Sequence, residues 1–274
     1  MHVVMTKGNS QGSVRWIHEE RVGDVVLFRA GKFGPQMVAD WPGLARLTCA
    51  PDGSSAKLVP AVGVSRREIG KLRRGQVRAL LRDLGGQLAL HASAVAIDGH
   101  AVLFIGPDGA GKSTAAAEMC LRHHAQMFAD DSASIEINRG GVFVLPSEMD
   151  HWLTRESCTA LGIEPRRAEG DAKRDMRASR VGREPSPLAL VVALRFDPTV
   201  AVAALRPLRG SDAGRLLLEA AIRFDVDDAT ARQREFEQVT TVYHCAPVVE
   251  LVRRREASCA VTPFVLQVLE GAGL

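Results

Sequence analysis

The sequence contains a phosphate-binding motif, Gly106-Pro107-Asp108-Gly109-Ala110-Gly111-Lys112-Ser113-Thr114, which fits G-x-x-x-x-G-K-[ST]. Glycines at these positions leave backbone N–H groups free to converge on an anion, and the following helix adds its positive N-terminal end. Lys112 is placed to reach the β- and γ-phosphates, and the Ser113 hydroxyl can bind the Mg²⁺ that bridges them. The motif predicts that residues 106–114 bind a nucleoside triphosphate.

The residues around the motif predict a strand, a loop and a helix. Ala101–Ile105 is a short continuous apolar run, which is typical of a buried parallel strand, and a helix is predicted from Thr114 through Leu121. Further along the chain we predict a hairpin (134–137 and 142–145), strands at 188–194 and 200–205, a helix capped by Ser211 and running to about Ile222, and a helix opened by Thr262 and Pro263 that ends near Gly271. This alternation predicts an α/β domain over residues 86–274.

Residues 1–85 carry no motif with visible chemistry. The runs Val25–Phe28 and Leu58–Val62 read as strands separated by Gly, Pro and Asp, so we predict a small β-rich subdomain here. An amphipathic helix with a basic stripe follows, interrupted at Gly70 or Gly75. The stripe is either a solvated helix face or a docking surface for an acidic partner; its residues are Arg67, Lys71, Arg74, Arg78 and Arg82.

Composition and charge exclude several classes of protein. The 274 residues are 46% hydrophobic and 24% charged, which argues against a disordered or collagen-like chain. The net charge of +3 gives no reason to expect a nucleic-acid partner. The five cysteines are scattered without a CxxC pair, so neither a disulfide framework nor a structural zinc site is predicted. No apolar run approaches the roughly 20 residues that span a bilayer, and we expect a cytoplasmic protein without a membrane partner.

Residues outside the phosphate loop indicate which class of P-loop protein the chain belongs to. The run Leu84–Gln87 has the composition of an ABC-type signature but precedes the phosphate loop, and no Asn-Lys-x-Asp run indicates a GTPase. The acidic residue expected after a second strand has two candidates. These are the pair Asp130 and Asp131 after Met127–Ala129, and Asp197, which is weaker because Arg195 interrupts its apolar run.

Three linked elements resemble a known family. Leu90-His91-Ala92-Ser93-Ala94-Val95, the phosphate loop and Phe128-Ala129-Asp130-Asp131 together resemble the catalytic domain of HPr kinase/phosphorylase and its shorter relatives. That family shares a P-loop fold with phosphoenolpyruvate carboxykinases. His91 lies 15 positions before Gly106 and Asp130 lies 18 after Lys112, spacings close to those of the family. The resemblance covers about residues 75–145 and is reduced to the order of strands and helices over 186–274.

The resemblance implies an α/β P-loop kinase fold of the HPr kinase and phosphoenolpyruvate carboxykinase type, with ATP and Mg²⁺ as cofactors. It assigns Asp130 with Ser113 to the metal and Asp131 to the acceptor hydroxyl as general base, although the two roles could be reversed within the pair. It makes His91 a partner of these carboxylates or of the γ-phosphate. From the residues alone, His91 could equally be a hydrogen-bonded structural residue.

The chain departs from the family after the Asp pair. The Glu-rich signature used for dephosphorylation is missing, which argues for a kinase without phosphorylase activity. In its place stands Pro146–Trp152, where Glu148 or Asp150 could lie near the metal, although we favour a surface loop. Lys173, Arg174 and Arg177 are either cations that reach the γ-phosphate or part of a solvated loop.

The predicted function is an ATP-dependent kinase that phosphorylates a serine-type hydroxyl of a protein or peptide. The shorter relatives include enzymes that phosphorylate precursor peptides, and the length and missing signature of this chain are similar to theirs. Two alternatives stay open: a kinase of small-molecule hydroxyls, and a nucleotide-binding regulatory subunit with little catalysis. The resemblance also allows a homo-oligomer, since the bifunctional family forms rings.

Overall fold

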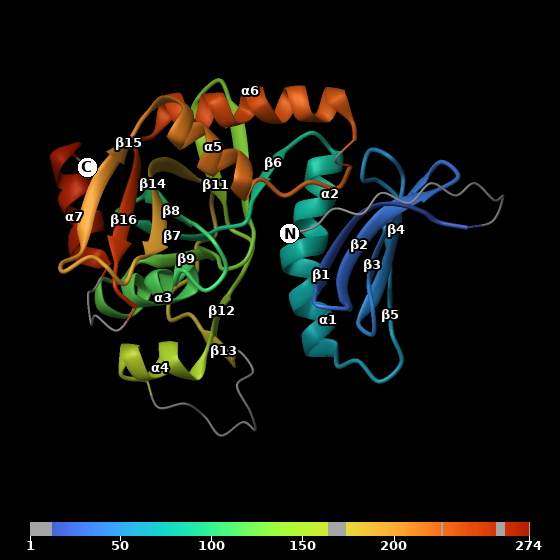
Figure 1. The fold of residues 1–274 in the computed structure, drawn as a ribbon, viewed down its shortest axis with the longest axis horizontal. Coiled ribbons are helices and arrows are strands. Elements are labelled where there is room, and N and C mark those ends of the chain that lie inside the picture. The colour runs from blue at the N-terminus through green and yellow to red at the C-terminus, as the bar shows by residue number, and fades with distance from the viewer. Residues whose placement is uncertain (1–12, 164–173, 226, 256–260, 274) are drawn as a thin grey trace. The chain divides into compact units, whose positions relative to one another are not determined.

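The computed structural model describes residues 13–163, 174–225, 227–255 and 261–273, drawn in colour in Figure 1. These residues form a mixed α/β protein made of two compact units. One unit holds residues 13–89 and Ile222–Phe236, and the other holds 90–221 and 237–273. The predicted division at residue 85 therefore leaves out a return of the chain to the first unit. Phe224 explains this return, because it is fully buried in the first unit's core and its N–H donates to Asp83 at 2.8 Å.

The first unit is built on an antiparallel sheet. Among the described residues the sheet has five strands in sequence order: β1 (Arg15–Val22), β2 (Val25–Phe33), β3 (Gln36–Trp41), β4 (Ala45–Cys49) and β5 (Lys57–Pro60). The predicted β-rich character of the N-terminal region is confirmed, with its two predicted strands falling on β2 and β5. β1, β3 and β4 were not predicted.

One side of this sheet is packed by a helical segment of three parts: α1 (Arg66–Leu72), the π-helical turn η1 (Arg73–Val77) and α2 (Arg78–Leu84). The interruption predicted at Gly75 therefore takes the form of a π-helical turn. Ser65 opens α1 with a capping box, accepting from the Glu68 N–H at 3.2 Å while Glu68 accepts from the Ser65 N–H at 3.0 Å. In the basic stripe only Arg67 is exposed, and the other four side chains are partly buried, so the stripe is not a fully solvated face.

The larger sheet belongs mainly to the second unit. In the described chain its strands run in the order β6-β10-β11-β14-β8-β7-β9, with β16 beside β14 and β15 beside β16. Their bounds are β6 (Leu88–Leu90), β7 (Ser93–Ile97), β8 (His100–Ile105), β9 (Gln126–Ala129), β10 (Ala133–Asn138), β11 (Gly141–Leu145), β14 (Ser186–Phe196), β15 (Ala204–Leu208) and β16 (Val248–Arg253). A separate two-stranded ribbon pairs β12 (Asp150–Leu153) with β13 (Arg174–Arg177).

Most of the predicted strands in this unit are present. The hairpin is confirmed as β10 and β11, and β8 runs parallel to β14 while pairing with β7 in the antiparallel sense. The strand predicted at 200–205 was misplaced, because β15 begins only at Ala204.

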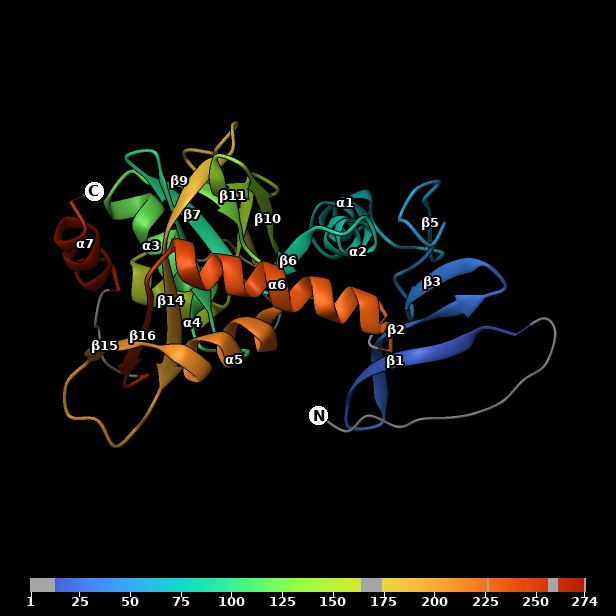
Figure 2. The same ribbon diagram turned by 90° about the horizontal axis from the view of Figure 1, so that it is seen from above.

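The sheet is covered by helices on both faces (Figures 1 and 2). α3 (Lys112–Arg122) and α7 (Thr262–Gly271) lie on one face, and α5 (Gly210–Ala220) lies on the other. The other helices after residue 90 in the described chain are α4 (Arg155–Leu161) and α6 (Ala229–Cys245). α7 begins as predicted, with Pro263 in its first turn. The predicted cap of α5 was wrong, because the N-cap is Arg209 and makes no side-chain cap hydrogen bond.

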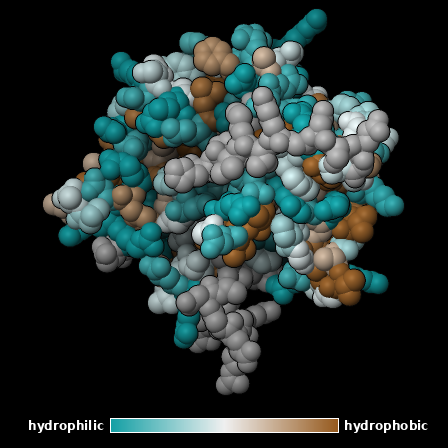
Figure 3. Space-filling model, turned by 45° about the vertical axis from the view of Figure 1, so that its right-hand side comes forward, coloured by the Kyte–Doolittle hydropathy of each residue, from teal (hydrophilic) through white to brown (hydrophobic). Residues whose placement is uncertain are grey.

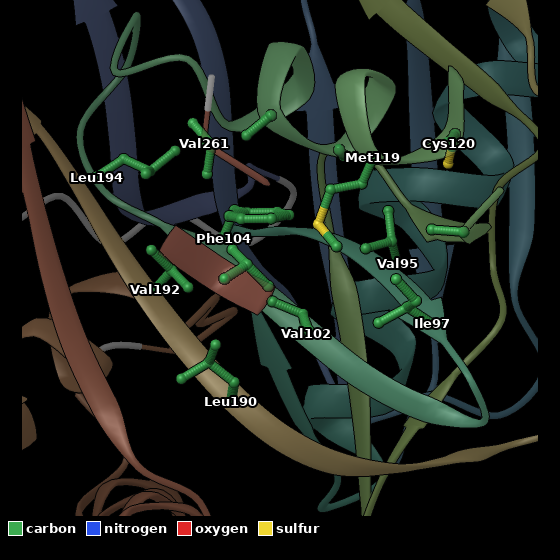
Figure 4. Packing of buried hydrophobic residues seen from close by; sticks show 14 of the residues in the cluster. Val95, Ile97, Val102, Phe104, Met119, Cys120, Leu190, Val192, Leu194 and Val261 are labelled. Atoms are coloured by element: carbon green, nitrogen blue, oxygen red, sulfur yellow. The ribbon is translucent and has the colours of Figure 1, made fainter. Parts of the chain in front are cut away.

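The core beneath α3 fixes the strand and the helix on either side of the phosphate loop. Val102 and Phe104 of β8 point toward Leu190 and Val192 of β14, and Met119 of α3 closes the cluster from above (Figure 4). Each large apolar side chain buried in this way contributes about 1.5–3 kcal/mol relative to an exposed one. The loop therefore connects two elements that are held firmly against each other.

On the face shown in Figure 3, the coloured surface is mostly hydrophilic, with hydrophobic patches between polar side chains. Isolated apolar side chains of this kind are common on protein surfaces and identify no binding site on their own. Of the helices in the described ranges, none has the length and apolar character needed to cross a membrane. Four cysteines are free thiols, three buried (Cys49, Cys120, Cys158) and one exposed (Cys245), while Cys259 lies outside the described residues.

Candidate nucleotide-binding site

The phosphate loop joins the end of β8 to the start of α3, as the motif requires. Gly111 is the N-cap of α3 with φ +90°, and a Cβ there would lie 2.6 Å from Nη2 of Arg253. Gly106 has φ +138°, and a Cβ there would lie 2.5 Å from the carbonyl oxygen of Leu194. At Gly106 the Leu194 backbone already fills the space that a side chain would need, and at both positions the positive φ favours glycine.

Lys112 is buried inside this loop. Its Nζ donates to the carbonyl oxygens of Gly106 at 2.8 Å and Pro107 at 3.3 Å, and it lies 3.9 Å from the Asp108 carboxylate. The loop thus curls around its own ammonium group. This is the position at which the motif places the β- and γ-phosphates.

A pocket of about 290 Å³ opens over the loop. It brings together the loop residues Asp108, Gly109, Gly111, Lys112, Ser113 and Thr114 with three other predicted residues, His91, Asp130 and Asp131. Gly106, Pro107 and Ala110 shape the loop without lining the pocket. The remaining lining residues are Ala115, Glu118, Arg122, Trp152, Thr154, Glu156, Ser157, Ala160, Leu161, Phe196, Arg253, Arg255 and Val261.

Asp130 forms the floor of this pocket, directly after β9. It is only 3% exposed, and its carboxylate accepts hydrogen bonds from the Trp152 N–H at 2.5 Å, from the Ser93 hydroxyl at 3.1 Å and from Ser113. Burial raises the pKa of Asp130 to about 6, and the neighbouring charge of Asp131 acts in the same direction against these hydrogen bonds. The carboxyl group is thus placed where a cation would stabilise its ionised form.

His91 connects the loop with the second carboxylate of the pair. Its Nδ1 lies 3.0 Å from the backbone oxygen of Asp131 and 3.8 Å from that residue's carboxylate, and its Nε2 lies 3.1 Å from Oδ1 of Asp108. The Asp131 side chain is 31% exposed, so its carboxylate faces the pocket rather than the core. The two acids of the pair therefore lie in different surroundings.

Ser113 and Asp130 are the residues of this pocket that could hold a magnesium ion. Their hydroxyl and carboxylate oxygens are the donors that Mg²⁺ prefers, and the two side chains already contact each other. No group of three or more His, Cys, Asp or Glu side chains able to hold a metal occurs within the described ranges. A protein-only metal cage is not needed here, since Mg²⁺ in such sites takes its other ligands from phosphate and water.

Two arginines that were not predicted complete the wall of the pocket. The Arg253 guanidinium lies over the Phe196 ring at 4.8 Å and donates to the Ala110 carbonyl at 3.3 Å, and the Arg255 guanidinium lies over the same ring at 5.0 Å. Arg253 is the last residue of β16, which runs parallel to β14, and Arg255 lies two positions beyond the strand. The signal that could have revealed them is the arginine run 253–255, which follows the run 248–252, apolar except for Glu250; ligands bind at the carboxyl ends of parallel strands.

The region 146–152 is not the surface loop that the sequence favoured. Glu148 and His151 are buried, and β12 starts at Asp150 and pairs with β13. The segment enters the site through Trp152, whose backbone binds Asp130 and which lines the pocket. Neither Glu148 nor Asp150 lines it, and Asp150 instead faces Arg177 at 3.7 Å.

Other candidates lie away from the pocket. The Asp197 carboxylate accepts from the Thr199 hydroxyl at 2.6 Å and from Arg195 at 2.9 Å, and it does not line the pocket. Lys173 lies outside the described residues, while Arg174 and Arg177 belong to β13. The Thr114 hydroxyl donates to Ser157 of α4 at 2.8 Å, which ties that helix to the loop.

Comparison with known proteins adds little to this geometry. No protein-family model matches the chain, and the search of curated proteins gives no match. Solved structures that are similar include the HPr(Ser) kinase/phosphatase from Coxiella burnetii, at 13% sequence identity and a TM-score of 0.31. The similar region covers 57% of this chain and 94% of that one. A likeness of this strength identifies neither the fold family nor the function of the chain.

Proposed function

We propose that the chain is an ATP-dependent P-loop kinase of the HPr kinase and phosphoenolpyruvate carboxykinase type, which transfers the γ-phosphoryl group to a serine-type hydroxyl of a protein or peptide. One observation carries this proposal. Lys112 and Ser113 of the phosphate loop share a single pocket with Asp130, Asp131 and His91, which come from distant parts of the sequence. These are the groups that phosphoryl transfer needs on the donor and acceptor sides.

The donor side would hold ATP by charge and backbone amides. The α3 N-terminus, Lys112, Arg253 and Arg255 place positive charge around the loop, which offsets the charge of a triphosphate. Ser113 and Asp130 would hold Mg²⁺, which when bound neutralises charge on the β- and γ-phosphates.

On the acceptor side, Asp131 is the carboxylate that can meet a hydroxyl group. As the acceptor oxygen bonds to the γ-phosphorus, the bond from phosphorus to the β,γ-bridging oxygen breaks, and the hydroxyl proton passes to Asp131. The products are ADP and the phosphate ester, and Asp131 then returns the proton to solvent. A carboxylate is basic enough for this step, because the transition state is loose and the hydroxyl loses its proton late. His91 contributes by holding the Asp131 backbone at 3.0 Å.

The first test is the substitution Asp131→Asn. We expect it to lower phosphoryl transfer by roughly 10²–10⁴-fold, as for loss of a general base, while ATP affinity changes little. The matched control is Asp98→Asn, which removes the same charge from the exposed turn between β7 and β8, outside the pocket. Normal transfer by Asp131→Asn would show that Asp131 is not the base.

The acceptor class is tested by supplying γ-labelled ATP with either a protein and peptide extract or a metabolite extract. Label in a serine of a protein or peptide supports the proposal. Label only in small molecules would assign the chain to the small-molecule kinases. ATP binding without label in either extract would favour a regulatory nucleotide-binding subunit.

A further inference from the structure

Asp108 is an acidic side chain inside an anion-binding loop, and the phosphate-binding motif does not account for it. Its side chain is 96% exposed, and its Oδ1 lies 3.1 Å from Nε2 of His91 and 3.9 Å from Nζ of Lys112. A negative charge at this place repels the phosphates that the loop is built to bind. It therefore weakens nucleotide binding unless it serves another purpose.

The contacts of His91 indicate that purpose. One ring nitrogen meets the Asp131 carbonyl at 3.0 Å and the other meets Asp108 at 3.1 Å. Both contacts are made to oxygen atoms and lie at opposite ends of the imidazole, so the ring is held at both ends and its orientation is fixed. Without Asp108, His91 would keep one of these two contacts and could rotate about it.

We propose that Asp108 is a positioning residue: it ties His91 to the phosphate loop, so that His91 holds the Asp131 backbone, and with it the acceptor-side carboxylate, in register with the bound donor. This role of Asp108 in holding Asp131 in position rests on the proposed kinase function. The same charge lowers nucleotide affinity through its closeness to Lys112. Asp108 thus favours the transfer step over tight binding of the ground state.

Removal of the side chain by Asp108→Ala should therefore lower kcat and at the same time tighten ATP binding, because the contact to His91 and the negative charge are lost together. We expect kcat to fall roughly 10-fold or more, because small displacements of reacting groups are costly. We expect the Kd for ATP to become about three- to tenfold tighter at low salt, because one exposed negative charge beside the phosphates is lost, with the gain shrinking as salt is added. Asp108→Glu keeps the charge and should restore part of kcat and the weaker binding.

The control is again Asp98→Asn, since Asp98 is exposed, lies outside the pocket and has φ +50°, a conformation that asparagine accepts. It should leave kcat and Kd unchanged. If Asp108→Ala lowers kcat and also weakens ATP binding, the substitution has damaged the loop and the proposal is wrong. An unchanged kcat in an active enzyme overturns it as well.

A second measurement separates this proposal from the proposed function. Modification of His91 by diethyl pyrocarbonate, followed by peptide mass spectrometry in the nucleotide-free protein, reports how firmly the ring is held. Asp108→Ala should raise the modification rate several-fold, and Asp98→Asn should not. If the wild-type protein phosphorylates nothing, the kinase proposal fails. The tie between Asp108 and His91 is then tested by the rate of His91 modification and by the affinity for ATP. If neither quantity changes in the Asp108 variant, the tie is refuted.

Discussion

Replacing Asp83 with asparagine should change the pH dependence of stability in a way that the structure lets us work out. Asp83 accepts a hydrogen bond from the Phe224 N–H at 2.8 Å, and burial raises the pKa of Asp83 from 3.8 to about 6. The neighbouring Glu235 adds to this rise, while Phe224, Arg234 and Arg223 oppose it. The folded protein therefore binds the Asp83 proton more tightly than the unfolded chain does.

The difference in pKa between the folded and unfolded states determines how the stability contributed by Asp83 changes with pH. The contribution of Asp83 to stability is greatest below about pH 4, falls as the pH rises to about 6, and is constant above that. The rise in the pKa of Asp83 from 3.8 to about 6 corresponds to about 3 kcal/mol of folding stability lost between low and high pH, at about 1.4 kcal/mol per pKa unit. Asp83→Asn abolishes this loss, because an amide oxygen can still accept the Phe224 N–H and carries no charge at any pH.

Urea unfolding followed by tryptophan fluorescence is the appropriate assay, at pH 4 and pH 7.5, on the wild type and Asp83→Asn. Asp130 has a pKa raised to about 6 as well, and other acids also titrate, but they contribute to both proteins. The free energy of unfolding of the variant, relative to that of the wild type, should therefore increase by up to about 3 kcal/mol between pH 4 and pH 7.5. The same difference at both pH values would refute the assigned burial of Asp83.

Two further predictions concern the phosphate loop. Gly106→Ala should weaken ATP binding by about tenfold or more, measured by calorimetry, because its Cβ would meet the Leu194 carbonyl oxygen at 2.5 Å and push the loop out of shape; unchanged affinity would contradict the described loop geometry. Arg255→Ala should weaken ATP binding by about three- to tenfold in the same assay, because an exposed cation beside Phe196 is lost. The control is Arg254→Ala, which removes a neighbouring arginine that does not line the pocket. Equal effects of the two substitutions would argue against a specific contact between Arg255 and ATP.

The parts of the fold that the sequence predicted correctly are those determined by nearby residues. Ala101–Ile105 is continuously apolar because β8 is buried on both faces, and the glycines and Lys112 that follow are a local motif. β1 was not predicted because its sequence, RWIHEERV, alternates too weakly, and its side chains are largely exposed or only partly buried. α6 was not predicted either, because the apolar residues among its 17 positions do not gather into a clear stripe on one face.

The parts of the site that were not predicted depend on contacts between distant residues. Arg253 lies over 140 positions beyond Ala110, whose carbonyl it contacts, and no local pattern reports that contact. The backbone of Trp152 reaches Asp130 because β12 passes beside the end of β9, whereas the polar run before it, containing Pro146 and Ser147, has the composition of a loop. Burial of such a polar segment becomes visible only once its hydrogen-bond partners are known.

The return of Ile222–Phe236 to the first unit has a consequence for how the protein can be divided. A shortened chain that begins at residue 86 would keep Phe224 but lose the core that buries it, together with the Asp83 carboxylate that binds its backbone. Conversely, residues 13–89 alone would lack the fully buried aromatic side chain that completes their own core. A single cut in the chain therefore cannot separate the two units, because the segment Ile222–Phe236 belongs to the first unit although it follows most of the second in sequence.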